Sequence, residues 1–230
     1  MKLQGIKVIA FDADDTLWVN EPYFREAEEK FCELLKGYMP KEESHKILFE
    51  IEMKNLPLYG YGIKPFALSL IEAAILVSKQ EVPISIVSKL MDIGKVMLQM
   101  PIELIDGIED TLKELSKKYR LVMATKGDLL DQERKLIRSG LEKYFHHIEV
   151  MSDKTPKQYH KLIQHLDCKP TEFLMIGNSM KSDILPVLKV GAYAIHIPFH
   201  TTWAHEIVND EVVHTNFQEL NKASEILRIV

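Results

Sequence analysis

Apolar residues follow two different periodicities along the chain. A continuous apolar and β-branched run, typical of a strand buried on both faces of a parallel sheet, occurs near the N-terminus, and four further strand-like runs occur in the C-terminal half. In chain order, these runs are IKVIAF, RLVMAT, HIEVMS, EFLMIGN and AYAIHIP. After residue 101 they alternate with segments whose apolar residues recur at helical spacing. This alternation predicts an α/β fold with a parallel, doubly wound sheet flanked by helices.

A block of predicted helices interrupts this alternation after the first strand. Four stretches have apolar residues near helical spacing, and we find no strand pattern among them. They cover residues 23–39, 41–55, 64–79 and 83–100. The sequence therefore predicts two domains. Residues 1–16 and 101–230 would form a Rossmann-like α/β core, and residues 17–100 would form an inserted all-helical cap.

Composition and charge narrow the class of protein. The 230 residues are 46% hydrophobic and carry a formal net charge of -5, so the chain can bury a core but has no basic field to attract nucleic acid. Cys32 and Cys168 are far apart, which argues against a disulfide framework and a cysteine zinc site. We find no signal peptide or membrane span and expect a cytoplasmic protein with a small-molecule partner. The sequence does not indicate an oligomeric state.

Three carboxylates crowd the end of the first predicted strand, where FDADDT follows KVIA. Asp12, Asp14 and Asp15 repel one another and are costly to desolvate. Asp12 and Asp14 are two residues apart, so in an extended chain their side chains would point to the same side. A divalent cation bound there would relieve the repulsion.

Polar residues also follow the other predicted strands. In an open parallel sheet, ligands bind beyond the carboxyl ends of the strands, so we expect these residues to converge on Asp12 and Asp14. They are Thr125, Lys154, Asn178 and Asp183. Carboxylates, a hydroxyl, an ammonium and an amide at one edge suit the binding of magnesium together with phosphate.

With these residues in place, the sequence resembles the haloacid dehalogenase (HAD) superfamily of phosphotransferases. DADDT matches the D-x-D-x-T motif, Thr125 after LVMA matches the second motif, Lys154 the third, and GNSMKSD the fourth. The resemblance covers the predicted sheet domain, and the inserted helices match a helical cap in placement and character. It implies a HAD-like fold and a magnesium-dependent phosphatase that hydrolyses a small soluble phosphate monoester.

The resemblance also implies a role for each motif residue. Asp12 would attack phosphorus and become an aspartyl-phosphate, while Asp14 would protonate the leaving alcohol and later activate water. Phosphate oxygens would be bound by Thr125, Lys126 and Lys154. Magnesium would be bound by Asp12, the main-chain carbonyl of Asp14, Asp183 and Asn178. Oxygen ligands serve manganese as well as magnesium.

Three positions depart from the family pattern. Asp15 stands where many members have glycine. Asn178 stands where the fourth motif often has aspartate, which predicts weaker magnesium binding and a higher magnesium requirement. The stretch KTPKQY differs from the commoner K-P-x-P form, so Lys157 is an alternative to Lys154 as the phosphate lysine. We favour Lys154 because it lies nearer the end of the strand.

Other functions stay open at this point. A phosphomutase of the same superfamily uses the same aspartates but returns the phosphoryl group to another hydroxyl. A non-catalytic phosphate-binding or regulatory module would keep the fold. A dehalogenase is disfavoured because that branch attacks carbon without magnesium and does not need Asp14.

Two further segments attract attention. Residues 56–65 contain two tyrosines among glycines and are either a substrate-selecting loop or a tight helix connection. Residues 196–206 contain three histidines and Trp203. We interpret the second segment as a loop beside the rim of the active site rather than as a second metal site.

Overall fold

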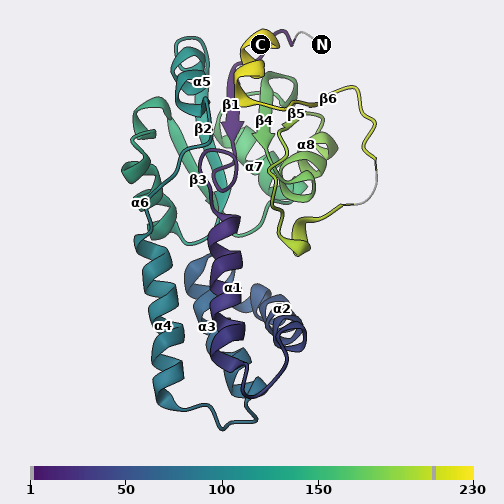
Figure 1. Ribbon diagram of the computed structural model, residues 1–230. Helices are drawn as coiled ribbons and strands as arrows, with labels where there is room; N and C mark the ends of the chain where they lie inside the picture. The colour runs from purple at the N-terminus through teal and green to yellow at the C-terminus, as the bar shows by residue number, and fades with distance from the viewer. Residues whose placement is uncertain (1–2, 209–210) are drawn as a thin grey trace. The chain divides into compact units, whose positions relative to one another are not determined.

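A parallel sheet organises most of the chain in the computed structural model, which describes residues 3–208 and 211–230. Within these residues the sheet has six strands in the order β3-β2-β1-β4-β5-β6, and every neighbouring pair is parallel (Figure 1). The strands are β1 (Val8–Phe11), β2 (Arg120–Lys126), β3 (His147–Met151), β4 (Phe173–Gly177), β5 (Tyr193–His196) and β6 (Phe217–Glu219). The predicted α/β fold with a parallel sheet is confirmed.

Strand β1 shows why the sequence pattern is continuously apolar. It lies between β2 and β4, and its four residues are fully buried. Ile9 and Phe11 belong to one hydrophobic cluster, and Val8 and Ala10 belong to another. Successive side chains of a strand point to opposite faces, so both faces of β1 need apolar residues.

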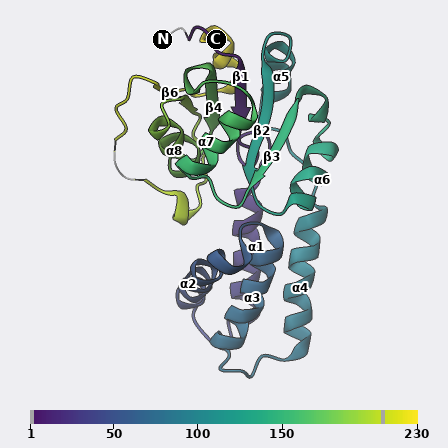
Figure 2. The same cartoon turned by 180° about the vertical axis from the view of Figure 1, so that it is seen from behind.

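Helices cover both faces of the sheet. The cluster around Ile9 includes Leu112 of α5 and Leu136 of α6, while the cluster around Val8 includes Leu162 of α7 and Val187 of α8. The bounds are α5 (Ile108–Leu115), α6 (Leu129–Ser139), α7 (Pro156–His165) and α8 (Leu185–Lys189). Figure 2 shows the same elements from behind. A π-helical turn, Met180–Ile184, precedes α8, so Pro186 lies at the start of that helix.

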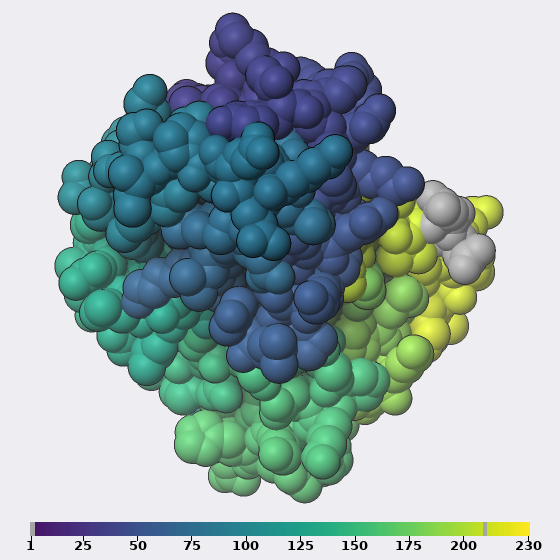
Figure 3. Space-filling view, turned by 90° about the horizontal axis from the view of Figure 1, so that it is seen from below, coloured from purple at the N-terminus to yellow at the C-terminus, as the bar shows by residue number. Residues whose placement is uncertain are grey.

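Four helices lie between β1 and α5, as predicted. They are α1 (Glu21–Leu35), α2 (Lys41–Tyr59), α3 (Ile63–Val77) and α4 (Ile84–Gln99). Their apolar faces form one hydrophobic cluster, and each helix contributes to it. Examples, one from each helix in chain order, are Phe31, Leu48, Leu70 and Leu90. Figure 3 shows the surface that residues of these helices form, in purple to teal. Residues 60–62 alone connect α2 to α3, so the tyrosine and glycine stretch contains a short helix connection.

The chain divides into two compact units. The α/β unit consists of the described residues of Met1–Glu21, Ile102–Lys126 and Gln132–Val230, and the helical unit consists of Pro22–Pro101 and Gly127–Asp131. Along the sequence, the first unit gives way to the second after residue 21, and the second gives way to the first after residue 101. The domain boundaries that we predicted at residues 16 and 100 stay a prediction. Within the described residues, no helix is long and apolar enough to cross a membrane.

Strand β6 is the element that the sequence pattern did not predict. Its three residues are only partly buried or exposed, because it lies at the edge of the sheet beside β5. A short edge strand has no continuous apolar run, and its pairing with β5 depends on the rest of the sheet. The segment 196–206 begins at the last residue of β5 and lies before β6 in the chain.

Candidate active site

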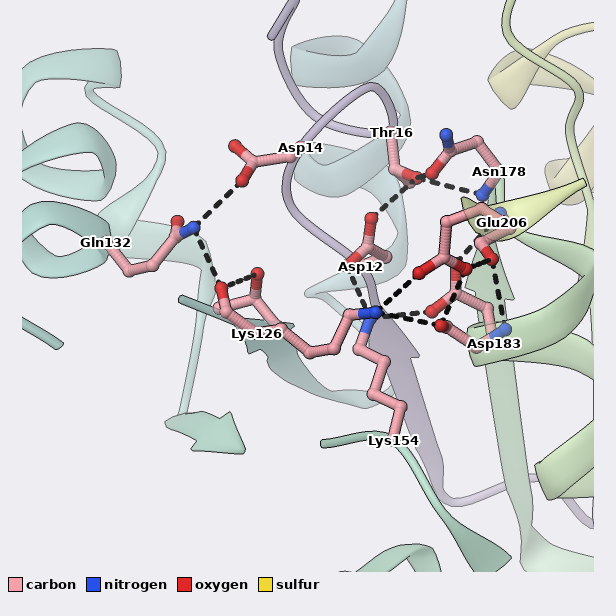
Figure 4. Close-up of polar contacts among 12 residues, drawn as sticks. Asp12, Asp14, Thr16, Lys126, Gln132, Lys154, Asn178, Asp183 and Glu206 are labelled. Atoms are coloured by element: carbon pink, nitrogen blue, oxygen red, sulfur yellow. Dashed lines mark hydrogen bonds and ion pairs between the residues drawn. The ribbon is translucent and has the colours of Figure 1, made fainter. Parts of the chain in front are cut away.

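The predicted site residues gather at the carboxyl ends of four strands of the α/β unit (Figure 4). Asp12 directly follows β1, Thr125 and Lys126 end β2, and Lys154 follows β3. After β4 come the remaining two residues, Asn178 and Asp183. Parallel pairing aligns all these strand ends, and the expected convergence of the motif residues is present.

Lys154 joins the two buried carboxylates of this edge. Its ammonium contacts Asp12 Oδ1 and lies 2.6 Å from Asp183 Oδ1. The backbone N–H of Asp12 donates to the Ile176 carbonyl of β4, which fixes the residue against the sheet. All three charged residues are buried. Lys154, rather than Lys157, makes these contacts.

Burial shifts the charge equilibria of this group. It raises the pKa of Asp12 to about 7, an effect that the neighbouring Asp183 increases and Lys154 opposes. Burial would lower the pKa of Lys154, but the Asp12 and Asp183 carboxylates outweigh it and raise that pKa well above its usual value. Lys154 therefore stays charged, and Asp12 becomes fully ionised above neutral pH.

Asp14 has different partners from Asp12. Its carboxylate accepts hydrogen bonds from the Trp18 indole (2.8 Å) and the Gln132 amide (2.9 Å) and pairs with Lys135 Nζ at 2.9 Å. Burial would raise the pKa of Asp14, but Lys135 and these hydrogen bonds together lower it. Asp14 is therefore a stable carboxylate in this arrangement.

The expectation that Asp12 and Asp14 point to the same side is wrong. That expectation was based on an extended chain, but β1 ends at Phe11. The chain then turns, and the N–H groups of Leu17 and Trp18 donate hydrogen bonds to the Ala13 carbonyl. This tight turn directs the Asp14 carboxylate toward Gln132, while Asp12 faces Lys154 (Figure 4).

Asp15, the first departure from the family pattern, has a positive φ of 61°. Glycine adopts this left-handed conformation without strain, and aspartate is one of the few other residues that tolerate it. The Asp15 carboxylate accepts hydrogen bonds from the backbone N–H groups of Asn20 (2.8 Å) and Glu21 (3.0 Å), where α1 begins. The carboxylate thus satisfies donors that a glycine would leave open, and its burial raises its pKa to about 7.

Asn178 brings the predicted cation ligands together. In the amide orientation that satisfies its neighbours, Nδ2 donates to Asp12 Oδ2 (3.3 Å), the Asp14 main-chain carbonyl (3.2 Å) and Thr16 Oγ1 (3.2 Å). Three oxygens, two of them from the predicted ligand residues Asp12 and Asp14, therefore surround the Asn178 amide group. Magnesium is bound in proteins by one or two carboxylates with neutral oxygens and water, so this donor set fits it.

The charge of the site is nevertheless low for a metal centre. Within residues 3–208 and 211–230, no group of three or more His, Cys, Asp or Glu side chains is arranged to hold a metal ion. The two carboxylates of the predicted ligand set, Asp12 and Asp183, already share Lys154. A cation here would depend on neutral oxygens, and Asn178 would contribute one only with its amide turned so that Oδ1 replaces Nδ2.

Gly177 makes room for the Asp183 carboxylate. A Cβ atom built on Gly177 would lie only 2.2 Å from Asp183 Oδ2, so no other residue fits at the end of β4 without displacing this side chain. Asp183 Oδ2 also accepts the Ser179 N–H at 3.0 Å, and the Asp183 N–H donates to the Ser179 carbonyl at 2.9 Å. The fourth motif thus places its carboxylate through backbone contacts.

The comparison with known proteins decides the family. The sequence profile of haloacid dehalogenase-like hydrolases matches residues 6–191. The chain belongs to this family. The helical insertion of this HAD-like hydrolase between β1 and β2 is consistent with a cap of the C1 type.

Individual relatives agree with this membership. A haloacid dehalogenase-like family hydrolase from Xanthomonas campestris is 35% identical, with a TM-score of 0.87 and coverage of 99% of this chain and 94% of that protein. The glyceraldehyde 3-phosphate phosphatase of Methanothermobacter thermautotrophicus is 25% identical over 96% of this chain and 100% of its own length. The HAD hydrolase YfnB of Bacillus subtilis, solved bound to magnesium, shares the fold with a TM-score of 0.65, at 18% identity and with coverage of 98% and 99%.

Thr125 and Lys126 of this HAD-like hydrolase contact neighbouring residues of the site. The Thr125 hydroxyl is buried and donates to the Lys126 carbonyl at 3.1 Å. The Lys126 ammonium lies 2.6 Å from Glu206 Oε1 and 2.9 Å from Ser182 Oγ. The phosphate-binding roles of both residues stay predictions.

Sequence reasoning missed several residues that complete the site. Gln132 and Lys135 lie three residues apart on α6, a spacing that puts them on one helix face, yet many solvent-exposed helix faces have the same pattern. Glu206 lies in the segment that we singled out for its histidines and Trp203, and no motif marks it. Folding alone brings these three residues to the strand ends.

Proposed function

We propose that the protein is a magnesium-dependent phosphatase that hydrolyses a small phosphate monoester through an aspartyl-phosphate on Asp12. The observation that supports it most strongly is the different setting of two neighbouring aspartates. Asp12 is buried against Lys154, as a nucleophile for phosphorus requires, and Asp14 is held nearby by separate partners, as an acid and base requires.

In the first step of this proposal, a carboxylate oxygen of Asp12 forms a bond to phosphorus while the ester P–O bond breaks. The leaving alcohol takes a proton from Asp14. In the second step water attacks the aspartyl-phosphate, Asp14 accepts a proton from that water, and inorganic phosphate leaves with Asp12 restored. The pair with Lys135 favours ionised Asp14, so we infer that Asp14 exchanges Lys135 for the substrate oxygen when it acts as the acid.

Binding of the phosphate group would use the cationic and hydroxyl side chains of the site. The Lys154 ammonium would contact phosphate as well as Asp12, and Thr125 and Lys126 would contact the remaining oxygens. The cation ligands would be Asp12, the Asp14 carbonyl, Asp183 and Asn178. When bound, magnesium supplies the positive charge that lets a phosphate dianion approach a carboxylate.

The relatives support a small phosphate ester as the substrate class. The curated relatives from Methanothermobacter thermautotrophicus and Methanopyrus kandleri are both glyceraldehyde 3-phosphate phosphatases, at 25% and 24% identity. We therefore propose a phosphorylated metabolite of this size and place glyceraldehyde 3-phosphate first among the compounds to test. Manganese is proposed as an alternative metal because its ligand preference is similar.

The test is phosphate release from a panel that includes glyceraldehyde 3-phosphate and p-nitrophenyl phosphate, with magnesium, with manganese and with chelator. We expect metal-dependent turnover that Asp12→Asn abolishes. The matched control is Asp110→Asn at an exposed position of α5, which should leave turnover unchanged. Turnover retained in Asp12→Asn, or no turnover of any ester by the folded parent, would contradict the proposal.

Two additional readouts separate the remaining alternatives. Turnover that requires a bisphosphorylated activator and yields an isomer rather than phosphate would indicate a phosphomutase. A magnesium titration tests the effect of Asn178, because a neutral ligand predicts saturation well above low micromolar metal. Saturation at low micromolar magnesium would contradict that prediction.

A further inference from the structure

Glu206 reaches the site from a segment that carries no HAD motif. It is the last residue of a 3₁₀ turn, Ala204–Glu206, between β5 and β6, and its side chain is only 11% exposed. Two hydrogen bonds to backbone carbonyls hold this turn in place, independently of the Glu206 side chain. The Glu206 N–H donates to the Trp203 carbonyl at 2.9 Å, and Lys181 Nζ donates to the His205 carbonyl at 2.8 Å.

The Glu206 carboxylate binds three side chains from two strand ends. Oε1 pairs with Lys126 at the end of β2, and Oε2 accepts hydrogen bonds from Ser182 Oγ (2.7 Å) and Ser179 Oγ. Burial would raise the pKa of Glu206, but Lys126 and the two hydroxyl groups outweigh it and lower that pKa to about 2. Glu206 is therefore ionised at any pH at which the protein is expected to work.

The two serines belong to the turn that carries Asp183. The Ser179 N–H donates to Asp183 Oδ2, and the Ser182 N–H donates to Ser179 Oγ at 3.0 Å. From the other side, the Tyr159 hydroxyl donates to the Ser182 carbonyl at 3.1 Å. A shift of Ser179 would consequently shift the carboxylate of Asp183.

Glu206 also balances a charge. The Lys126 side chain is only 14% exposed, and its ammonium lies 2.6 Å from Glu206 Oε1. Without Glu206, this second ammonium would add to the positive charge of Lys154 and offset the charge of Asp12 and Asp183. With Glu206 and an ionised Asp12, the group keeps one net negative charge and so attracts a cation.

We propose that Glu206 is a positioning residue of the hydrolase site, which ties the turn of Asp183 to the end of β2 and cancels the charge of Lys126. The inference rests on the proposed function, because it assigns Asp183 to the cation. Its first consequence is for metal binding, since partners that orient a ligand contribute strongly to affinity.

The experiment measures magnesium affinity directly, by isothermal titration calorimetry of the full chain without substrate. Glu206→Gln keeps the size of the side chain but removes its charge. We expect magnesium binding to weaken by about tenfold or more. The matched control, Glu109→Gln, removes a carboxylate that pairs with Lys143 on an exposed surface, and its affinity should equal that of the parent.

Kinetics and melting temperature distinguish positioning from simple stabilisation. If Glu206 positions the site, high magnesium should restore much of the kcat of Glu206→Gln. A variant with a lower melting temperature but unchanged magnesium affinity would overturn the inference. If Glu206→Gln does not fold, Ser182→Ala removes one partner of Glu206, and its magnesium affinity should fall several-fold. Unchanged affinity in that variant would likewise overturn the inference.

The two proposals fail in different ways. A folded parent that neither binds magnesium nor releases phosphate would contradict both the proposed function and the role of Glu206. A parent that does both, with Glu206→Gln indistinguishable from it in magnesium affinity, would contradict the role of Glu206 alone. A double variant, Lys126→Gln with Glu206→Gln, should recover only part of the affinity, because the neutral amide oxygen is a weaker acceptor for the two serines than the carboxylate. Full recovery would overturn the positioning role.

Discussion

The two compact units of this protein differ in where their charged side chains lie. In the α/β unit, charged side chains such as Asp12, Lys154 and Asp183 are buried and pair with one another. In the helical unit most ion pairs lie on the surface, for example Glu26 with Lys30 one helical turn apart. The buried polar residues of its helices are mostly uncharged, although Glu28 is buried and pairs with Arg25.

This difference locates the functional site in the α/β unit. Surface ion pairs contribute little to stability, whereas a buried charge is tolerated only with a partner, because desolvation is expensive. A cluster of buried, mutually dependent charges therefore indicates that the site serves function rather than stability. The helical unit shows the opposite pattern, with an apolar core and a solvated surface. The following substitutions test the contrast, beginning with the most severe.

Lys154→Met should have the largest effect, because it leaves Asp12 and Asp183 buried without their shared cation. We expect the free energy of unfolding in chelator to fall by about 3–5 kcal/mol and phosphate release to be lost. Urea denaturation with and without magnesium measures it, and magnesium should restore part of the stability. The matched control is Lys157→Met, an exposed position at the start of α7. A larger effect in the control would reverse our choice between the two lysines.

Asp15→Asn should change how stability depends on pH. The pKa of Asp15 is about 7 in the folded protein, above its ordinary value of 3.8, so the folded state holds the proton more tightly and stability falls as pH rises from about 4 to 7. The amide variant lacks this loss. We expect its stability relative to the parent to improve by about 2 kcal/mol between pH 5 and pH 8. Thermal denaturation at both pH values measures the change, and an identical difference at both would contradict the prediction.

Lys135→Met should act on the reaction more than on the fold. Without this ammonium, burial of Asp14 is opposed only by the neutral donors Trp18 and Gln132, so the pKa of Asp14 should rise. The alkaline limb of the pH profile of kcat/KM should move to higher pH, because the protonated acid then persists to higher pH. Lys117→Met, at an exposed pair with Glu114, is the control. An unmoved pH profile would argue against Asp14 as the acid.

Lys30→Ala in the helical unit should have the smallest effect. Its pair with Glu26 spans one turn of α1 at 2.7 Å, and both side chains are about half exposed. Screening by water and salt weakens such pairs, so we expect no measurable change in melting temperature or in phosphate release. A clear loss of either would show that surface charge in this unit matters more than the comparison implies.

The sequence predicted those parts of the molecule that depend on local pattern. Strand-like runs located five strands, and helical spacing located the four inserted helices. The run is continuously apolar in β1 and β4, because every residue of these two strands is buried. Asp12 and Asp183 converge because parallel strands end at the same edge. In each case the requirement can be read from neighbouring residues.

The remaining features depend on tertiary contacts. Nothing in the polar stretch of α6 distinguishes Lys135 from a solvated lysine, and only the folded chain brings it to Asp14. Glu206 meets Lys126 across 80 positions of sequence, and the direction of Asp14 follows from a turn that the D-x-D-x-T pattern does not specify. Long-range pairs of this kind leave no periodic signal in the sequence.

The central place of β1 has a consequence for the order in which the protein folds during synthesis. β1 is the first strand to be made, but its partners β2 and β4 begin at Arg120 and Phe173. The helices α1–α4 are complete long before then, and among them α2 packs against α3 and α3 packs against α4. Contacts between distant segments form slowly because long loops have to close. Asp12 is therefore made long before the residues that it contacts in the folded protein. A nascent chain that has not yet reached about residue 183 has no complete hydrolase site.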